Sequence, residues 1–344
     1  VATVKNEQLK NSVTKNSFFQ NPGQIISGFK SFGVTSKPSK DFVKSPMPVI
    51  LQADAGDGSA ASSSPNASSF VRLLKKNMGT IIKLSFIAIL IVPNLAWTKD
   101  IEVHFAFVGQ KDDAALLGAH QGLIEANLQG RFLNQKYELE LINFKNILTH
   151  DFSKYIAVLT VVDIDTYYKL VDILPNIAIF NLSIKNNLLR TACIKNALHI
   201  IPSNAMELDA TNQWKKKSPH SSAKAQAWHP DFVKFAARDL NKRYKKHQQV
   251  SMNDSSWAGW AAVKMTSDTV ARTKIDNSTE MLHYLKTELT FDGQKGSVMN
   301  FRETGQLRQP ILLIEKNKIV AEAPVRGVAK VPALDSLGLL SCKK

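Results

Sequence analysis

The chain has 344 residues and a formal net charge of +15, with 44 Lys and Arg against 29 Asp and Glu. Hydrophobic residues make up 44% of it and only two residues are cysteine, which excludes a collagen-like chain, a disulfide-dense mini-domain and a fully disordered protein. Residues 1–77 carry ten basic and four acidic side chains, so much of the positive charge lies ahead of any expected folded domain.

Residues 1–77 are rich in Ser, Lys, Asn, Pro and Gly and include a tract of Ala, Ser, Pro and Asn at 60–69. Such a composition buries too little apolar area to offset the entropy of ordering the chain. We predict a disordered, non-native or leader sequence here. Three origins stay open: upstream sequence translated in frame, an organelle transit peptide, and a fusion linker.

Residues 78–98 have the layout of a secretory signal peptide. Met78 and Lys83 precede an apolar run at 84–97, and polar residues begin at Thr98. A single membrane anchor is the alternative, because Asn94 is not the small residue usual before a cleavage site. We expect export to the periplasm, a mature chain that begins near Trp97–Lys99, and no stable membrane span after removal of the signal.

The next residues alternate between strand and helix patterns. Strands are predicted at 101–109 and 137–143, and a helix over 112–129 with Gly130 at its C-cap. The continuous apolar runs 156–162 and 177–182 are typical of parallel strands that are buried on both faces. A helix near 165–173, a short strand at 198–201 and a helix at 204–214 complete an α/β pattern with a parallel sheet.

A polar, basic segment, residues 215–226, interrupts this alternation. Beyond it the pattern predicts helices and then strands. The expected helices are 230–245, 255–272 and 278–289, and the expected strands are 297–301, 310–315 and 318–321.

Several blocks, in order, resemble type 1 periplasmic solute-binding proteins. The most similar branch is the ABC-transporter substrate-binding protein of PQQ-dependent (quinoprotein) alcohol dehydrogenase systems. The blocks are GAHQGLIEAN at 118–127, GRFL at 130–133, YELE at 137–140, FNLS at 180–183, LRTAC at 189–193, LHIIPS at 198–203, AWH at 227–229, WAGWAAV at 257–263, LRQPILL at 307–313 and LDSLG at 334–338 with Cys342.

The resemblance implies a type 1 periplasmic-binding-protein-like α/β fold and binding of a small polar solute without catalysis or cofactor. It also implies an ABC permease or a quinoprotein dehydrogenase system as partner. One departure is large: only residues 215–226 stand where the family has most of a second lobe, of order 100 residues. The expected division is therefore 1–77 leader, 78–98 signal peptide, 99–214 first part of the α/β lobe, 215–226 connector in place of the second lobe, 227–296 helices returning to the first lobe, and 297–344 remnant strands and tail.

Ligand contacts are expected beyond the carboxyl ends of the parallel strands. Polar side chains stand there at Asp163, Asn181 and Ser183, and they are the candidate ligand-binding residues. Ordinary turn and helix-cap chemistry is the competing explanation for each of them.

The sequence contains no nucleophile elbow, zinc-protease motif, phosphate loop or dinucleotide fingerprint, so we expect no enzyme activity. His220 and His229 are too isolated to suggest a metal site. The basic stretches 215–217 and 242–247 are interpreted as solvated helix ends, with no nucleic acid as partner. Trp257 and Trp260 are expected to pack in the core.

Cys193 and Cys342 both follow the signal peptide, and an oxidising compartment would let a disulfide between them persist. A buried Cys193 with a free thiol at Cys342 is the alternative. Two other functions remain open beside solute binding: a truncated, degenerate product without ligand, and a basic protein that binds nucleic acid or a membrane surface. The sequence identifies neither the solute nor the oligomeric state.

Overall fold

The computed structural model describes residues 100–338, 341 and 342. The leader at 1–77 and the signal peptide at 78–98 lie outside the described residues and stay predictions. The elements in chain order are β1 (Ile101–Val108), α2 (Ala114–Gly130), β2 (Gln135–Ile142), β3 (Tyr155–Thr160), α3 (Ile164–Ile173), β4 (Ala178–Asn181), α4 (Asn187–Thr191), β5 (Ala197–His199), α5 (Asn204–Lys215), β6 (Lys224–Gln226), α6 (Ala237–Gln248), α7 (Asp254–Thr273), α8 (Ser278–Thr287), β7 (Ile311–Glu315) and β8 (Lys318–Ala323).

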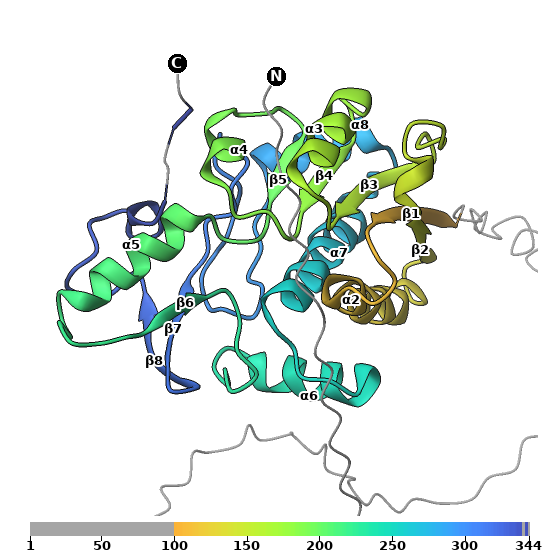
Figure 1. The fold of residues 1–344 in the computed structure, drawn as a ribbon. Helices are drawn as coiled ribbons and strands as arrows, with labels where there is room; N and C mark the ends of the chain where they lie inside the picture. The colour runs from red at the N-terminus through yellow and green to blue at the C-terminus, as the bar shows by residue number, and fades with distance from the viewer. Residues whose placement is uncertain (1–99, 339–340, 343–344) are drawn as a thin grey trace, which may run out of the picture. The chain divides into compact units, whose positions relative to one another are not determined.

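Five strands form a parallel sheet in the order β2-β1-β3-β4-β5 (Figure 1). Each strand from β1 to β5 is followed by a helix or a longer connection before the next, as parallel pairing requires. The predicted α/β fold with a parallel sheet is confirmed.

Both faces of this sheet are covered. All six residues of β3 and all four of β4 are buried, and both strands are interior to the sheet. On β1, Phe105 and Phe107 join the core that contains α2 and α7, whereas Ala106 and Val108 join the core that contains α3. Successive side chains point to opposite faces, which explains why these strands are uninterrupted apolar runs.

Helices α2 and α7 lie against each other at very short distance. A Cβ atom built on Gly118 would fall 1.8 Å from the carbonyl oxygen of Ser256, and one on Gly259 would fall 1.9 Å from that of Ala115. The two glycines therefore allow direct contact between the helix backbones.

The remaining strands form an antiparallel sheet in the order β6-β7-β8. Strand β6 lies inside the segment that was expected to be only a connector. Its three residues gain strand geometry by pairing with β7, and α5 packs on the same sheet through Met206 and Ala210.

Two other expectations need correction. Helix α6 begins at Ala237 and not at residue 230, because Phe235 and Ala236 have φ angles of 51° and 65° and end the preceding turn. Residues 297–301 form no strand. Only isolated bridges join Met299 to Phe291 and Phe301 to Leu307.

The parallel and antiparallel sheets are joined by backbone pairing. Gln306 forms a parallel bridge to His199 at the edge strand β5, with His199 N donating to Gly305 O at 2.7 Å and Leu307 N donating to His199 O at 2.9 Å. The same segment continues after a few residues into β7. A Gln309 Nε2 donation to Ile200 O, at 2.5 Å, adds a side-chain link.

Candidate functional site

The carboxyl ends of β3, β4 and β5 meet at one edge of the parallel sheet. The segments that leave this edge lead to the capped amino ends of α3, α4 and α5. Open parallel sheets bind ligands at this edge, so the three predicted site residues can be tested there for what they contact.

Asp163 caps a helix. Its Oδ1 accepts a hydrogen bond from Thr166 N at 2.9 Å, and its Oδ2 accepts one from Thr166 Oγ1 at 2.7 Å. The backbone hydrogen bond, followed by the hydroxyl, lowers the pKa of Asp163. Its side chain faces solvent at the start of α3 and does not line the cavity described below.

Asn181 is fully buried and organises the turn that follows β4. Its Oδ1 accepts hydrogen bonds from Ser183 N (3.2 Å) and Ile184 N (2.8 Å), and its Nδ2 donates to Ile184 O (2.8 Å). Nδ2 also lies 3.0 Å from His199 Nδ1. With these contacts satisfied, Asn181 shapes the turn that positions Ser183.

His199 lies beneath this turn as a neutral ring. Burial, with the charge of Arg190 adding to it, holds the pKa of His199 well below its ordinary value. The amide of Asn181 faces Nδ1, which assigns the ring proton to Nε2. Nε2 has no hydrogen-bond partner among the described residues.

Ser183 lines a polar groove of about 480 Å³ at this edge of the sheet. Its other polar walls come from segments far apart in the chain: Lys185 after β4, His229 after β6, Asp254 and Ser255 at the start of α7, and Asn317 in the β7–β8 turn. The groove thus brings together an ammonium, a carboxylate, an imidazole and hydroxyl groups.

The two charged groups of the groove are held by hydrogen bonds. Lys185 Nζ lies 2.5 Å from Glu207 Oε1, and burial raises the pKa of Glu207 while Lys185 partly opposes the rise. Asp254 Oδ1 accepts from Trp228 N at 2.8 Å. Each group keeps further hydrogen-bonding capacity, so an anion near Lys185 and a cation near Asp254 can both be satisfied.

His229 is almost fully buried and fixed on both ring nitrogens. Nδ1 accepts a hydrogen bond from Asp231 N at 3.2 Å, which leaves the proton on Nε2 facing Asn317 Oδ1 at 3.3 Å. The ring therefore connects the turn after β6 with the β7–β8 turn and forms a rigid wall of the groove.

Aromatic rings form the floor behind that wall. The Trp228 ring stacks on Trp257 with centroids 5.9 Å apart, and Lys295 Nζ lies 3.8 Å from the centroid of the Trp257 ring. Trp257 and Trp260 are buried, which confirms that they belong to the core. Lys295 Nζ donates to Gln309 Oε1 at 2.7 Å, and burial lowers the pKa of this ammonium to about 7.

A buried arginine holds the rim in place. Arg190 Nη1 donates to Ile184 O at 2.6 Å, and Nη2 donates to Ile201 O at 3.0 Å. Its Nε donates to Gln306 Oε1 at 2.9 Å, and burial lowers its pKa to about 10. One side chain thus ties the turn that carries Ser183 to the segment after β5.

The strand-end rule located one of the residues that line the groove, Ser183, and missed the others. Lys185 stands two residues beyond the last predicted position. His229 and Asp254 come from parts of the chain that no strand-end argument covers. From the sequence, His229 was considered only as part of the AWH block and as a histidine too isolated for a metal site.

Metal binding has no support in the part of the chain that the structure describes. No group of three or more His, Cys, Asp or Glu side chains there could hold an ion. Nor is any helix among residues 100–338 long and apolar enough to cross a membrane.

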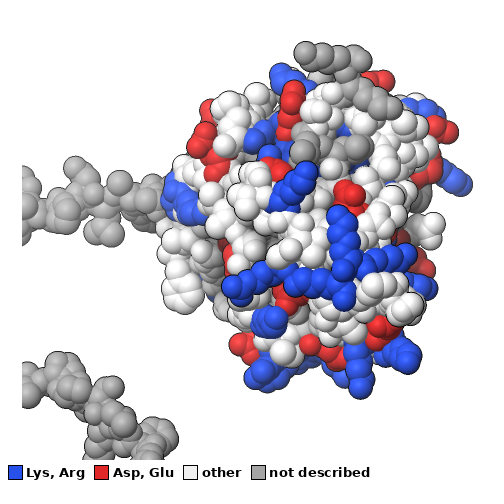
Figure 2. All heavy atoms as spheres, turned by 90° about the vertical axis from the view of Figure 1, so that its left-hand side faces the viewer, with Lys and Arg blue, Asp and Glu red and all other residues white. Residues whose placement is uncertain are grey.

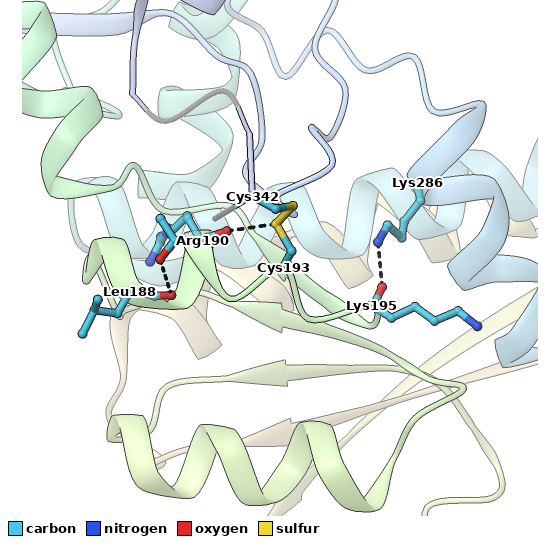
Figure 3. The surroundings of a disulfide bond; sticks show 7 residues. Leu188, Arg190, Cys193, Lys195, Lys286 and Cys342 are labelled. Atoms are coloured by element: carbon cyan, nitrogen blue, oxygen red, sulfur yellow. Dashed lines mark hydrogen bonds between the residues drawn. A yellow bond between two sulfur atoms is a disulfide. The ribbon is translucent and has the colours of Figure 1, made fainter. Parts of the chain in front are cut away.

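Cys193 and Cys342 are joined by a disulfide bond with their Cα atoms 5.7 Å apart (Figure 3). This separation lies in the range that a disulfide spans without backbone movement. Cys193 lies between α4 and β5, so the bond attaches the end of the chain to the parallel sheet at the amino end of β5.

Comparison with solved structures supplies the fold's relatives. A branched-chain amino acid ABC transporter periplasmic ligand-binding protein from Burkholderia xenovorans aligns with a TM-score of 0.54 and 10% identity over 64% of this chain and 95% of that one. An amino acid ABC transporter substrate-binding protein from Pseudomonas fluorescens aligns with a TM-score of 0.54 and 7% identity, over 71% of this chain and 99% of that one. A periplasmic binding protein from Burkholderia mallei aligns with a TM-score of 0.52 and 9% identity, over 64% of this chain and 94% of that one.

The fold is that of type 1 periplasmic binding proteins. No protein-family model matches the sequence, and no curated protein matches it either. Identities near 10% establish the architecture alone, so the ligand and the biological role rest on the groove itself.

Proposed function

We propose that this chain is a non-catalytic solute-binding protein of the ABC-transporter type that holds a small polar solute in the groove at Ser183. The observation that carries the proposal is the convergence of Ser183, Lys185, His229 and Asp254 on one groove at the carboxyl edge of the parallel sheet. These residues come from three separate segments, which the fold brings to the edge where such sheets bind ligands.

The chemistry of the groove favours a solute that bears a carboxylate. Lys185 would bind the anionic end by a charge-assisted hydrogen bond, and the Ser183 and Ser255 hydroxyls can add neutral ones. Asp254 on the same groove suits a solute that also carries a hydroxyl or an ammonium group. Small hydroxy acids and amino acids meet both conditions.

The biological setting is a finer part of the proposal. The sequence blocks resemble the binding proteins of PQQ-dependent alcohol dehydrogenase systems, so we infer a solute related to alcohol oxidation and an ABC permease or quinoprotein dehydrogenase as partner. The signal-peptide pattern at 78–98 supports a periplasmic location. N-terminal sequencing of protein from a periplasmic fraction should find a chain that begins near Trp97–Lys99. An intact Met78 region on cytoplasmic protein would contradict export.

Residues 215–226 also belong to this proposal, as a short connection where related proteins have most of a second lobe. Two-lobed binding proteins close around their ligand. A single lobe leaves its solute open to water on one side, so we expect affinities weaker than those of a closing pair of lobes.

Thermal-shift and calorimetric screening of the purified chain tests the binding site. The panel contains leucine, isoleucine, small hydroxy acids, other carboxylic acids, aldehydes and alcohols. The Lys185→Gln variant should weaken binding of carboxylate solutes by roughly 10- to 100-fold, the range for one charge-assisted hydrogen bond. Lys169→Gln is the matched control, because Lys169 is exposed on α3, and this variant should bind as the native chain does.

Lys185 also pairs with Glu207, so a second variant guards against a folding defect. Lys185→Gln combined with Glu207→Gln removes both charges of the pair and should melt cooperatively while still failing to bind carboxylates. A cooperative melt with no shift for any compound of the panel, or equal binding by the Lys185 and Lys169 variants, would contradict the proposal.

A further inference from the structure

Three segments on one side of the molecule carry basic side chains and no acidic ones. They are 215–224, 316–321 and 326–334. Their cations are all exposed, and none forms an ion pair in the described part of the chain. We call these the basic face: Lys215, Lys216, Lys217, Lys224, Lys316, Lys318, Arg326 and Lys330.

The three segments meet in space. Lys216 and Lys330 line the same cavity, and Lys224 and Lys316 line the same shallow groove at the end of the small sheet. Lys217 Nζ lies 3.9 Å from the position that a Cβ on Gly327 would take. Figure 2 shows Lys and Arg gathered in a band across the side of the molecule that lies to the left in Figure 1, where α5 and β8 are seen.

The acidic groups beside this face already have partners. Glu315 accepts from Ser222 N and Oγ at 2.7 and 2.8 Å, and Glu322 pairs with Lys234 at 2.5 Å. In the cavity, Asp209 Oδ2 accepts from Gly338 N at 2.7 Å, and Asp335 Oδ1 pairs with Arg308 at 2.6 Å. None of these carboxylates forms an ion pair with a lysine of the basic face.

The cavity in the basic face is amphipathic. It measures about 830 Å³ and lies between α5 and residues 328–336. Lys216 and Lys330 stand on its walls beside Val328, Val331 and Pro332. Val331 is 92% exposed, so an apolar residue projects into solvent at the cavity that Lys216 and Lys330 line.

We propose that the basic face docks on the surface of an anionic phospholipid bilayer, with a headgroup phosphate at Lys216 and Lys330 and with Val331 entering the interfacial region. Each lysine near an anionic leaflet adds electrostatic attraction, which salt screens. Stable peripheral binding needs a second kind of contact, which an apolar residue in the interfacial region provides. Nucleic acid fits less well, because binding to bases uses stacked aromatic rings. The nearest aromatic ring of the face, Trp214, is half-buried with its Nε1 bonded to Ser221 Oγ at 3.0 Å.

Vesicle co-sedimentation of the full chain tests this proposal. We would measure the partition coefficient of the chain on two kinds of vesicle, one an equal mixture of phosphatidylglycerol and phosphatidylcholine and the other pure phosphatidylcholine. The quantity compared between variants is the ratio of the first partition coefficient to the second. Residues 1–99 are present in every variant, so their contribution cancels between variants. One lysine near the bilayer is worth about a factor of five in this ratio, so Lys216→Gln with Lys330→Gln should lower it roughly 25-fold at about 0.05 M salt. The native ratio should collapse at about 0.5 M salt.

The matched control is Lys242→Gln with Lys246→Gln on α6, which removes two exposed lysines from another element and should change the ratio less than about twofold. All variants should keep the native melting temperature. The proposal would be overturned if the ratio of partition coefficients fell equally in both double variants, or if it did not fall in the variant with Lys216→Gln and Lys330→Gln. Tighter retention of a DNA duplex by the same lysines would overturn it in favour of nucleic acid. Displacement by soluble glycerol phosphate would overturn it in favour of a free phosphate ester.

Discussion

The contact between α2 and α7 makes Gly118 the most sensitive backbone position that the structure identifies. Gly118→Ala places a methyl group 1.8 Å from the carbonyl oxygen of Ser256, and a real Cβ atom needs at least 3.0 Å. Neither group is a flexible side chain, so the helices must separate by about 1 Å. A gap of that size removes a quarter to a half of the attractive dispersion energy of each contact between α2 and α7.

The expected cost can be set against the gain in helix propensity. Alanine is favoured over glycine inside a helix by about 1 kcal/mol, whereas overpacking of a core costs 1–3 kcal/mol and occasionally more. With a backbone clash the steric cost dominates, and we expect a net loss of ~3 kcal/mol in the free energy of unfolding. For a folded part of this size the melting temperature should fall by roughly 6–12 °C.

Urea unfolding and thermal melts followed by circular dichroism would measure the loss. Gly122→Ala on the same helix is the matched control, because its Cβ would fall 2.9 Å from Val263 Cβ and 3.1 Å from Trp260 O, a much milder overlap than the 1.8 Å at Gly118. It should cost clearly less than Gly118→Ala, and Gly259→Ala should cost about as much. A Gly118→Ala chain as stable as the native one would refute direct backbone contact between the helices.

Three further predictions concern the disulfide bond and two buried side chains. Thiol titration of the unfolded, unreduced chain should find no free thiol, since Cys193 and Cys342 are bonded. Reduction should lower stability by at most roughly 4–5 kcal/mol for a loop of this length, and two free thiols would disprove the bond. His199 stays neutral when folded and titrates near 6.5 when unfolded, so the free energy of unfolding should fall by about 1.4 kcal/mol per pH unit below 6.5. His199→Gln should flatten that slope in urea titrations, and an unchanged slope would refute the assignment. Arg190→Met removes the charged donor from Ile184 O, Ile201 O and Gln306 Oε1, so it should cost roughly 3 kcal/mol or more and weaken solute binding, with Arg190→Lys intermediate. A native melting curve for Arg190→Met would contradict that role.

The sheet could be predicted from the sequence because its strands are buried on both faces. The runs at 156–162 and 177–182 correspond to β3 and β4, where no position faces water and none needs to be polar. Strand β6 gave no such pattern. Its three residues, Lys224–Gln226, are partly exposed and take strand geometry only through pairing with β7, more than 80 residues later.

The groove was less predictable for a related reason. Strand ends can be located from local sequence, and that placed Ser183 correctly at the edge of the sheet. The same rule also selected Asp163 and Asn181, whose side chains cap a helix and form a turn. Lys185 lies in the same loop, two residues beyond the predicted positions, whereas His229 and Asp254 reach the groove only through tertiary packing, which no local pattern encodes.

The backbone bridge at His199 and Gln306 has a mechanical consequence. A hinge between two sheets needs a connection whose hydrogen bonds stay intact as it bends. Here the connecting segment, residues 305–307, is itself paired with β5, the edge strand of the larger sheet, before the chain continues toward β7. Swinging the small sheet would break the Leu307 and His199 amide hydrogen bonds and uncover the buried Gln306 side chain. The two sheets therefore form one cooperative unit of unfolding, and these amides should exchange their hydrogens with solvent no faster than the centre of β3 does.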